Sequence, residues 1–576
     1  MKIKTLKPNV YFIALIFIVI IGSLIRFSGI DKADGLWYDE ILSYSLSKNA
    51  FPFGIIDTVM KNEFQGVLHY LYLGVWMIFF GESDLSLRLS SFIFGIMLIP
   101  AIYLLGKEVH SKGFGLFIAL MTAFNPLLVY YSQEVRPYSL LSFLGVLSFL
   151  FLFRALRQPD RLNFFIYGLA NVLILYTYTI GFVFVFLQVA VLLLYLKFTQ
   201  NMALKKFAVA ALSVLILYLP YLASVISNFS YYFSSAFIEP FFYSDFTFYG
   251  LLIMLQDWFT PLLFGIYRYN DGLYKEIFLS GLNGQFVFFL LIMSVVLTLL
   301  FGLIACISKE KRLALLIFLP CFAFLGFEFL ADLFGSFCLV TRHTLLVFPL
   351  ILLLCCLGLY KFANRKGVAV FISGLLLFYC LNFIGEDSVA RWERGGIKPV
   401  VGFLTGYNLG KDDIVLVPSH SGFIKKCLPT VNTLDINYME AVFLDKSKLS
   451  LKKFIANQEI INKTNKNNSH ILLKTYLIQE KPSVSLENYL NKSITGLKKG
   501  RYLIIIRKTD YASFEENELK EILENPQKYK NTAMFRMFTS KIVNDLIKIS
   551  GKSLDFIEKK EVKSIWTVYI FRKELI

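Results

Sequence analysis

Long apolar runs separated by short basic connections constrain this chain more than any other feature. Each run is long enough to cross a lipid bilayer as a helix, which takes about 20 residues. Composition agrees, because 56% of the residues are hydrophobic and only 17% are charged, whereas about a quarter of a soluble domain is charged. The sequence therefore predicts a polytopic α-helical membrane protein with about eleven spans, at 10–27, 89–106, 114–130, 138–153, 163–180, 182–198, 207–226, 284–307, 313–330, 343–360 and 367–384.

The basic residues predict how the chain is oriented in the membrane. Lysines and arginines gather before the first run and in five connections, near 107–112, 154–161, 197–206, 309–312 and 361–366. All six groups fall on the cytoplasmic side if the N-terminus is cytoplasmic, as the positive-inside rule requires. An odd number of spans then places the C-terminus outside the cell membrane.

One apolar stretch, 66–80, is not counted as a span, because counting it would reverse every later connection. Its apolar residues recur at helical spacing and it ends at Gly81. We expect an interfacial helix on the outer leaflet, within a first external loop that covers 28–88.

The character of the chain changes after about residue 385. The stretches "DDIVLVPS", "HILLKTYLI", "RYLIIIRKT" and "SIWTVYIFRK" are typical of strands, with lysine-rich segments between them. We therefore predict two domains: a transmembrane catalytic domain over 1–384, and a smaller extracytoplasmic soluble α/β domain over 385–576.

The formal net charge is +17. A solvated lysine-rich domain accounts for it, and so does a surface that attracts anionic lipids or polymers. Nucleic acid is not expected as a partner, because no nucleic-acid-binding motif accompanies the charge.

Polar residues gather on the predicted outer face. Each has an ordinary structural alternative: acids that cap a helix, an arginine anchored at the interface, an interfacial histidine, a glutamate paired with its neighbouring arginine, or an aromatic-belt tyrosine. Together they form a candidate site, made of Asp39 and Glu40 in "WYDE", Glu134, Arg136 and Tyr138 in "YYSQEVRPYS", and Arg342 and His343 in "LVTRHTLL".

Residues 10–360 resemble the GT-C superfamily of membrane glycosyltransferases, near the aminoarabinose transferase and dolichyl-phosphate-mannose-protein mannosyltransferase families. The resemblance is carried by "WYDE", by "GESDLSLRLSSFIFGIMLIPAIYLLGK" (81–107), by "YYSQEVRPYSLL" (130–141) and by Arg342. It implies transfer of a sugar from a polyprenyl-phosphate donor to a lipid, glycan or protein acceptor of the envelope, on the extracytoplasmic face.

The resemblance also implies roles for the candidate residues. Asp39 matches the family's catalytic aspartate, the general base that takes the acceptor's proton, and Glu40 orients the acceptor or the base. Arg342 is the first candidate to stabilise the departing lipid phosphate, since a guanidinium can grip two oxygens at once. Arg136 and His343 are second candidates. Glu134 binds sugar hydroxyls or holds Arg136, and Tyr138 completes the donor-binding set.

Two positions depart from the family pattern. Gln65, in "QGVLHY", stands where relatives carry a histidine, with His69 displaced, and Tyr178 stands where relatives read Tyr-Thr-His. Since histidine is a common metal ligand, we assign no metal ligand and no cofactor, and a divalent metal remains an open alternative.

Two other functions remain open as alternatives. A transporter or flippase of lipid-linked saccharides would also have many spans, although such proteins usually carry midplane sites and inverted repeats. A non-catalytic membrane protein that binds envelope polymers is the third possibility. We rank the glycosyltransferase first, because the polar residues of this chain gather at one predicted membrane face and not at the midplane.

Overall fold

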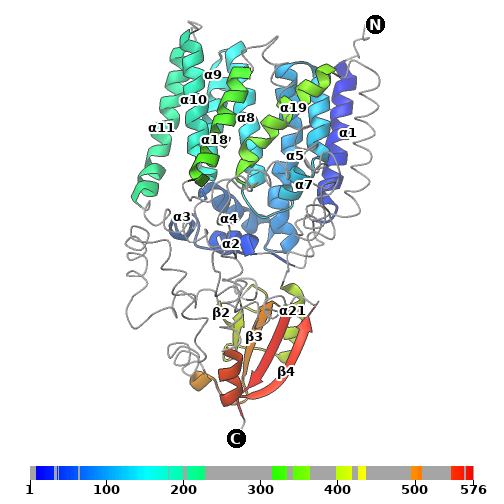
Figure 1. Ribbon diagram of the computed structural model, residues 1–576, viewed down its shortest axis with the longest axis vertical. Coiled ribbons are helices and arrows are strands. Elements are labelled where there is room, and N and C mark those ends of the chain that lie inside the picture. Colours follow the sequence, from blue (N-terminus) through cyan, green and yellow to red (C-terminus); the bar gives the residue numbers. More distant parts are fainter. Residues whose placement is uncertain are drawn as a thin grey trace, which may run out of the picture. The chain divides into compact units, whose positions relative to one another are not determined.

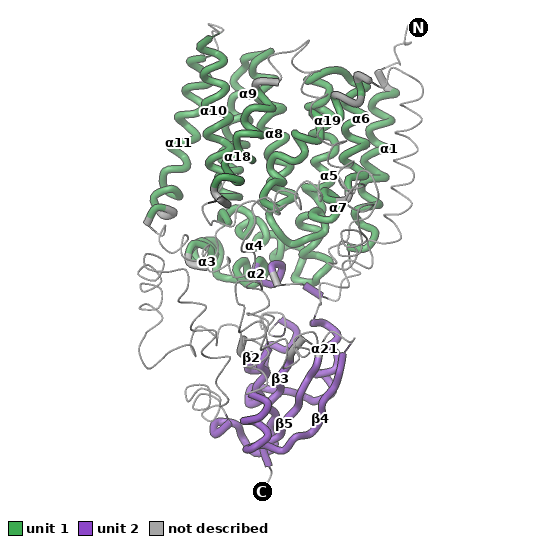
Figure 2. The backbone as a smooth tube through the Cα atoms, viewed as in Figure 1, with its two compact units in different colours: residues 1–33, 43–229, 246–393 green, residues 34–42, 230–245, 394–576 purple. Residues whose placement is uncertain are grey.

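A computed structural model of the chain describes residues 8–30, 35–36, 38–62, 65–179, 181–198, 204–227, 314–333, 342–362, 397–417, 424, 426–435, 494–508, 546–562 and 566–574. The chain separates into two compact units, which Figure 2 colours differently. We call them the helical unit (Met1–Ala33, Ser43–Phe229 and Phe246–Glu393) and the sheet unit (Asp34–Leu42, Ser230–Asp245 and Arg394–Ile576).

The helical unit holds most of the described helices (Figure 1). In chain order the α-helices are α1 (Pro8–Phe27), α2 (Tyr38–Ser47), α3 (Phe53–Asn62), α4 (Leu68–Phe80), α5 (Asp84–Val109), α6 (Lys112–Phe124), α7 (Pro126–Ser132), α8 (Tyr138–Arg157), α9 (Arg161–Thr177), α10 (Gly181–Phe198), α11 (Leu204–Ser227), α18 (Leu319–Leu333) and α19 (Phe348–Phe362). The division between the units cuts α2 after Leu42.

Five of the described helices are long and apolar enough to cross a membrane. They contain Val10–Phe27, Asp84–Val109, Tyr138–Arg157, Gly181–Phe198 and Leu204–Ala223. The expectation of a multi-pass helical membrane protein is therefore confirmed. The spans expected at 284–307 and 367–384 lie outside the described residues, so the number of spans stays a prediction.

Helix α4 matches the expected helix at 66–80. It is 13 residues long, which at 1.5 Å per residue is too short to cross the hydrocarbon core of a bilayer. Gly81 ends it with a φ of 79°, a left-handed conformation that glycine adopts without a steric penalty. The position of α4 on the outer leaflet stays a prediction.

Several expected spans have different boundaries in the structure, and two of them illustrate why. The prediction of one continuous helix over 114–130 is wrong, because α6 ends at Phe124 and α7 begins at Pro126. Pro126 has no backbone N–H for an unbroken helix, and the Asn125 side chain caps α7 by accepting a bond of 3.0 Å from the Leu128 amide. The run 343–360 opens as a 3₁₀ turn, η2 (His343–Leu346), before α19 starts.

A buried polar network joins three helices of the unit. Gln188 of α10 donates to the Ser148 hydroxyl of α8 over 3.1 Å, and Ser148 donates to Asn171 of α9 over 3.1 Å. All three side chains are buried. Such interhelical bonds hold membrane helices together where lipid offers no hydrogen-bond partner.

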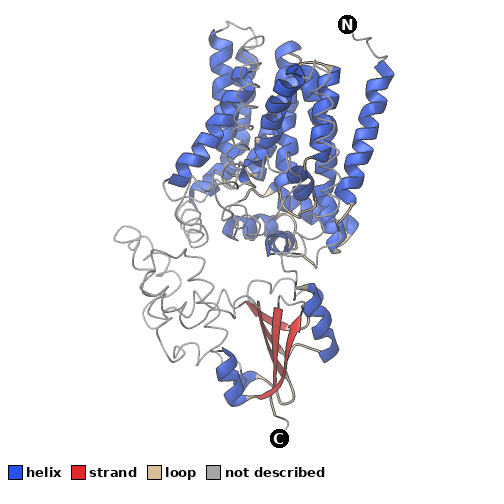
Figure 3. Cartoon of the chain, turned by 45° about the vertical axis from the view of Figure 1, so that its right-hand side comes forward, coloured by secondary structure: helices blue, strands red, loops and turns tan. Residues whose placement is uncertain are grey.

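The sheet unit contains all the described strands (Figure 3). These are β1 (Ile414–Val417), β2 (Asn432–Asp435), β3 (Tyr502–Lys508), β4 (Asp555–Val562) and β5 (Trp566–Arg572), in the sheet order β2-β1-β3-β5-β4. Strand β1 is parallel to β2 and β3, whereas β5 is antiparallel to β3 and β4. A short helix, α21 (Lys398–Leu404), precedes β1.

Three of the strands that the sequence predicted are confirmed as β1, β3 and β5. The fourth, 470–478, lies outside the described residues. The sequence did not predict β2 or β4.

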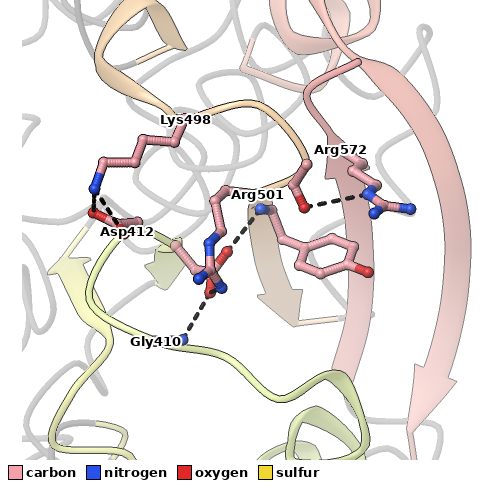
Figure 4. Close-up of polar contacts among 8 residues, drawn as sticks. Gly410, Asp412, Lys498, Arg501 and Arg572 are labelled. Carbon is pink, nitrogen blue, oxygen red and sulfur yellow. Dashed lines mark hydrogen bonds and ion pairs between the residues drawn. The ribbon is translucent and has the colours of Figure 1, made fainter. Parts of the chain in front are cut away.

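Asp413 fixes the entry to β1. Its buried carboxylate accepts from the amides of Gly410 (2.7 Å) and Tyr502 (2.8 Å) and lies 3.4 Å from the Arg501 guanidinium (Figure 4). Because Tyr502 begins β3, this carboxylate ties β1 and β3 together. Neighbouring Asp412 instead pairs with Lys498 at the surface, over 3.0 Å.

Candidate functional site

Arg136 is buried where three helices of the helical unit meet. Its Nη1 donates to the Ser43 hydroxyl of α2 over 3.3 Å and contacts the Tyr70 hydroxyl of α4 at 3.5 Å. Its guanidinium carbon lies 5.8 Å from the centre of the Tyr138 ring, at the start of α8. We call Ser43, Tyr70, Arg136 and Tyr138 the Arg136 cluster. It holds a positive charge in a buried, hydroxyl-rich surrounding, where charge interactions are stronger than in water.

The connection between α7 and α8 that carries Arg136 is held by its own hydrogen bonds. The Arg136 amide donates to the Glu134 carbonyl over 2.7 Å, and Ser139 donates to the Tyr131 carbonyl over 2.9 Å. Gln133 reaches the Ser28 carbonyl just after α1, over 3.2 Å. This connection is buried along its whole length, Glu134 included. The backbone that carries Arg136 is therefore held by packing as well as by hydrogen bonds.

His69, in the first turn of α4, lies beside this connection. Its imidazole donates to the Val135 carbonyl. The pKa of His69 is lowered to about 3, first by burial and then by the nearby Arg136 charge, while the bond to Val135 opposes the change. The ring is therefore neutral at physiological pH, and its second nitrogen is a hydrogen-bond acceptor.

A second group of residues joins segments far apart in the sequence. Gln65 and Tyr178 pair as an antiparallel β-bridge, and the Gly66 amide donates to the Thr177 carbonyl over 3.1 Å. The Tyr178 ring lies 5.8 Å from the His343 ring. We call Gln65, Tyr178 and His343 the bridge cluster. The chains approach so closely that a Cβ on Gly66 would lie 2.1 Å from the Tyr176 carbonyl oxygen, so this position requires glycine.

Helix α8 links the two clusters. Ser142, one turn after Tyr138, donates to the Leu345 carbonyl of η2 over 2.8 Å. One turn further on, a Cβ on Gly145 would lie 2.6 Å from the Leu346 carbonyl oxygen. The turn that carries His343 is therefore packed directly against the helix that begins with Tyr138, and partly exposed Arg342 comes just before that turn.

The structure brings together some of the predicted site residues. Glu134, Arg136 and Tyr138 share one buried connection, and His343 joins Tyr178. Asp39 and Glu40 lie in the first turn of α2, which begins at Tyr38; Asp39 is partly exposed and Glu40 is buried. The expected proximity of Asp39 to Arg342 stays a prediction.

Sequence reasoning missed several contacts of the site. Nothing in the pattern of the sequence singled out Ser43 or Tyr70 as partners of Arg136. Gln65, His69 and Tyr178 were visible as departures from the family pattern, but not as neighbours in space. Among the described residues, no three histidine, cysteine, aspartate or glutamate side chains lie where they could share a metal ion.

Comparisons with known proteins give a sequence match over part of the chain. Residues 66–223 match the sequence model of a family described as dolichyl-phosphate-mannose-protein mannosyltransferase. The comparison with curated proteins returned no match.

Two solved structures resemble this chain in fold. ArnT from Cupriavidus metallidurans in the apo state is 11% identical, with 96% of this chain and 97% of that chain covered and a TM-score of 0.53. The Archaeoglobus fulgidus oligosaccharyltransferase, tethered to an acceptor peptide containing the NVT sequon, is 13% identical, with 93% and 72% covered and a TM-score of 0.50. The resemblance to GT-C membrane glycosyltransferases is therefore confirmed, by sequence over 66–223 and by fold over most of the chain.

Proposed function

We propose that this protein is a glycosyltransferase that moves a sugar from a polyprenyl-phosphate donor to an acceptor of the cell envelope. The observation that carries the proposal is the family match, since its name specifies a lipid-phosphate sugar donor and its range contains Tyr70, Arg136 and Tyr138 of the Arg136 cluster. Of the bridge cluster the range contains Tyr178. The acceptor class is open: a lipid, a glycan or a protein would each supply the hydroxyl.

The proposed chemistry assigns the proton to Asp39. The acceptor oxygen attacks the anomeric carbon of the sugar while the Asp39 carboxylate takes the hydroxyl proton. The bond between the anomeric carbon and the phosphate oxygen breaks, and its electron pair leaves with the lipid phosphate. Glu40, the next residue on α2, orients the acceptor or the base.

The departing phosphate needs positive charge nearby. Arg342 is the first candidate and Arg136 the second. Asp39 precedes Ser43 by four residues, so both side chains lie on one face of α2. The Ser43 hydroxyl is the group that accepts a hydrogen bond from Arg136. His343, Glu134 and Tyr138 belong to the donor site, where Glu134 binds sugar hydroxyls.

The proposal includes a topology. The chain crosses the cell membrane about eleven times, with a cytoplasmic N-terminus, α4 on the outer leaflet and an extracytoplasmic domain from about 385 to 576. An apolar groove between spans holds the prenyl tail, so that the donor reacts without leaving the bilayer. Neither nucleic acid nor a metal ion is required by this scheme.

The test is sugar transfer by the purified full-length chain in proteoliposomes. The donors are undecaprenyl-phosphate sugars, the acceptors are an envelope extract, and mass spectrometry follows free undecaprenyl phosphate and the glycosylated product. We expect Asp39→Asn to lower the rate about 100-fold or more, since it removes the general base. Glu82→Gln is the matched control, because Glu82 is an acid of the same loop that pairs with Lys48 at the surface; it should keep the wild-type rate.

Two results would contradict the proposal. An Asp39→Asn variant as fast as the wild type would remove Asp39 as the base. A wild-type protein that moves the lipid-linked sugar across the vesicle membrane without cleaving it would be a flippase.

A further inference from the structure

Two buried hydrogen-bond acceptors lie at the start of α4. Within the part of the chain that the structure describes, the Gln65 amide oxygen and the His69 Nε2 have no hydrogen-bond partner. Gln65 is 5% exposed and His69 is 2% exposed. They are four positions apart in the sequence, and each belongs to one side of the candidate site: Gln65 to the bridge cluster and His69 to the connection that carries Arg136.

Buried acceptors without a donor are unusual in native proteins. A buried acceptor without a donor destabilises a protein by about 1–3 kcal/mol, and buried polar atoms in native proteins nearly always have a partner. Here the surrounding backbone is already paired, since Gly66 bonds to Thr177 and His69 to Val135. A bound molecule with hydrogen-bond donors would satisfy both atoms.

The chemistry of the two atoms restricts that molecule. Both atoms accept, so the ligand has to donate. A phosphate diester and a prenyl tail have no donor hydrogen at neutral pH. A cation is disfavoured, because the Arg136 charge acts on His69 strongly enough to lower its pKa. A compound with several hydroxyls fits, because each hydroxyl donates one hydrogen bond and can accept another from Arg136 or a tyrosine.

We propose that Gln65 Oε1 and His69 Nε2 form a subsite that accepts hydrogen bonds from hydroxyls of the sugar on the lipid-phosphate donor. This inference rests on the proposed function and deepens it, because it names the residues that recognise the sugar. His69 binds the sugar directly there: Val135 fixes which ring nitrogen carries the hydrogen, so the other always presents its lone pair.

The variants separate the acceptor role from a structural one. Gln65→Leu keeps the size of the side chain and removes the acceptor. His69→Asn places an amide nitrogen where Nδ1 was, so that it can still donate to Val135, but it has no atom in the place of Nε2. His69→Gln is the rescue variant, because its amide oxygen can occupy the place of Nε2.

The measurement is equilibrium binding to the full chain in lipid nanodiscs. The probes are a short-chain polyprenyl phosphate without a sugar and the same lipid carrying mannose, glucose or N-acetylglucosamine. For each variant we take the ratio of the two dissociation constants, bare lipid over sugar-bearing lipid, because this ratio cancels a general loss of lipid binding.

We expect the wild type to bind at least one sugar-bearing lipid more tightly than the bare lipid. Gln65→Leu and His69→Asn should each lower the ratio by about 3–10-fold, the weight of one hydrogen bond, and His69→Gln should recover most of it. Ratios that stay at the wild-type value in both variants would mean that water occupies the two acceptors, and would overturn the subsite.

Two outcomes separate this inference from the proposed function. A wild-type protein that binds the bare lipid but prefers none of the three sugars lacks the subsite. A wild-type protein that does not bind the bare lipid either would contradict the lipid-phosphate donor itself.

Discussion

At the scale of single residues, Arg136 shows what a sequence reveals of such a site. Its neighbours Glu134 and Tyr138 were predicted with it, because the three lie within five positions of one connection. Its partners Ser43 and Tyr70 were not, because they come from helices 93 and 66 positions away along the chain. Contacts of that kind depend on how the helices pack, and one sequence carries no periodic signal for them.

His69 gives a prediction on pH. The unfolded chain takes up a proton on this histidine near pH 6.5, whereas the folded chain does so only near pH 3, where burial and Arg136 place its pKa. The unfolded state therefore binds more protons between these values, and stability falls as pH falls through that window. At pH 5 the loss from His69 should be about 2 kcal/mol relative to pH 7.5.

Thermal unfolding of the full chain in detergent checks this. His69→Asn, which does not titrate there, should lose less of its midpoint between pH 7.5 and pH 5 than the wild type. The chain has only five histidines, so few other groups change charge in this range. Equal losses in the two proteins would contradict a neutral, buried His69.

At the scale of elements, hydropathy predicted helices better than it predicted where they end. The break between α6 and α7 was visible as Asn125-Pro126, yet the apolar run continues through it and hid the boundary. Strand β4 was missed for a different reason: its sequence, "DFIEKKEV", is charged and largely exposed at the edge of the sheet, so it lacks the apolar alternation that predicts a strand.

Because η2 packs closely against α8, one added methyl group at Gly145 should lower both the stability of the protein and the rate of sugar transfer. Gly145→Ala would bring a Cβ to 2.6 Å from the Leu346 carbonyl, which forces backbone apart and should lower stability by about 1–3 kcal/mol. Because η2 carries His343 and follows Arg342, sugar transfer should also fall. The measurements are the unfolding midpoint and the transfer rate.

Gly168→Ala is the control for this variant. Gly168 lies within α9, and its added Cβ would come no closer than 3.8 Å, to the Val214 side chain. Alanine also favours helix over glycine by about 1 kcal/mol, so this variant should be as stable as the wild type or more so. Equal losses in both variants would contradict the close approach of η2.

The sheet unit predicts a contrast between two adjacent aspartates. Asp413→Ala would leave the part-buried amides of Gly410 and Tyr502 without their acceptor, which should cost about 3 kcal/mol. Asp412→Ala should change little, since Asp412 is partly exposed, its partner Lys498 is exposed, and a surface ion pair contributes little. Hydrogen exchange of the full chain should show faster exchange in β1 and β3 for Asp413→Ala alone. Similar exchange in both variants would contradict the central place of Asp413.

At the scale of the whole molecule, the sequence predicted a membrane protein with a strand-containing C-terminal part. Both features are present, because long apolar helices and short alternating strands each leave a local signal. The sidedness of the chain rests on charge alone, since charges bias orientation without fixing any contact. The sidedness is a property of the whole chain and of no single segment, so it needs its own test.

Protease treatment of spheroplasts or protoplasts, in which the cell membrane is intact but the outer layers of the envelope have been removed, provides that test. An epitope tag at the C-terminus should be digested, whereas a tag at the N-terminus should survive until the membrane is broken. A protected C-terminal tag would place the sheet unit in the cytoplasm, and would contradict a reaction on the outer face.

The central claim is that the chain cleaves a lipid-phosphate sugar and gives the sugar to an envelope acceptor. The most direct measurement is mass analysis of envelope glycans and of polyprenyl-phosphate lipids from cells that carry either the wild-type protein or Asp39→Asn at equal protein levels. The account predicts that one sugar substituent disappears from an envelope component in the variant, while the polyprenyl phosphate that carries this sugar accumulates. Identical glycans and identical lipids in the two strains would contradict it.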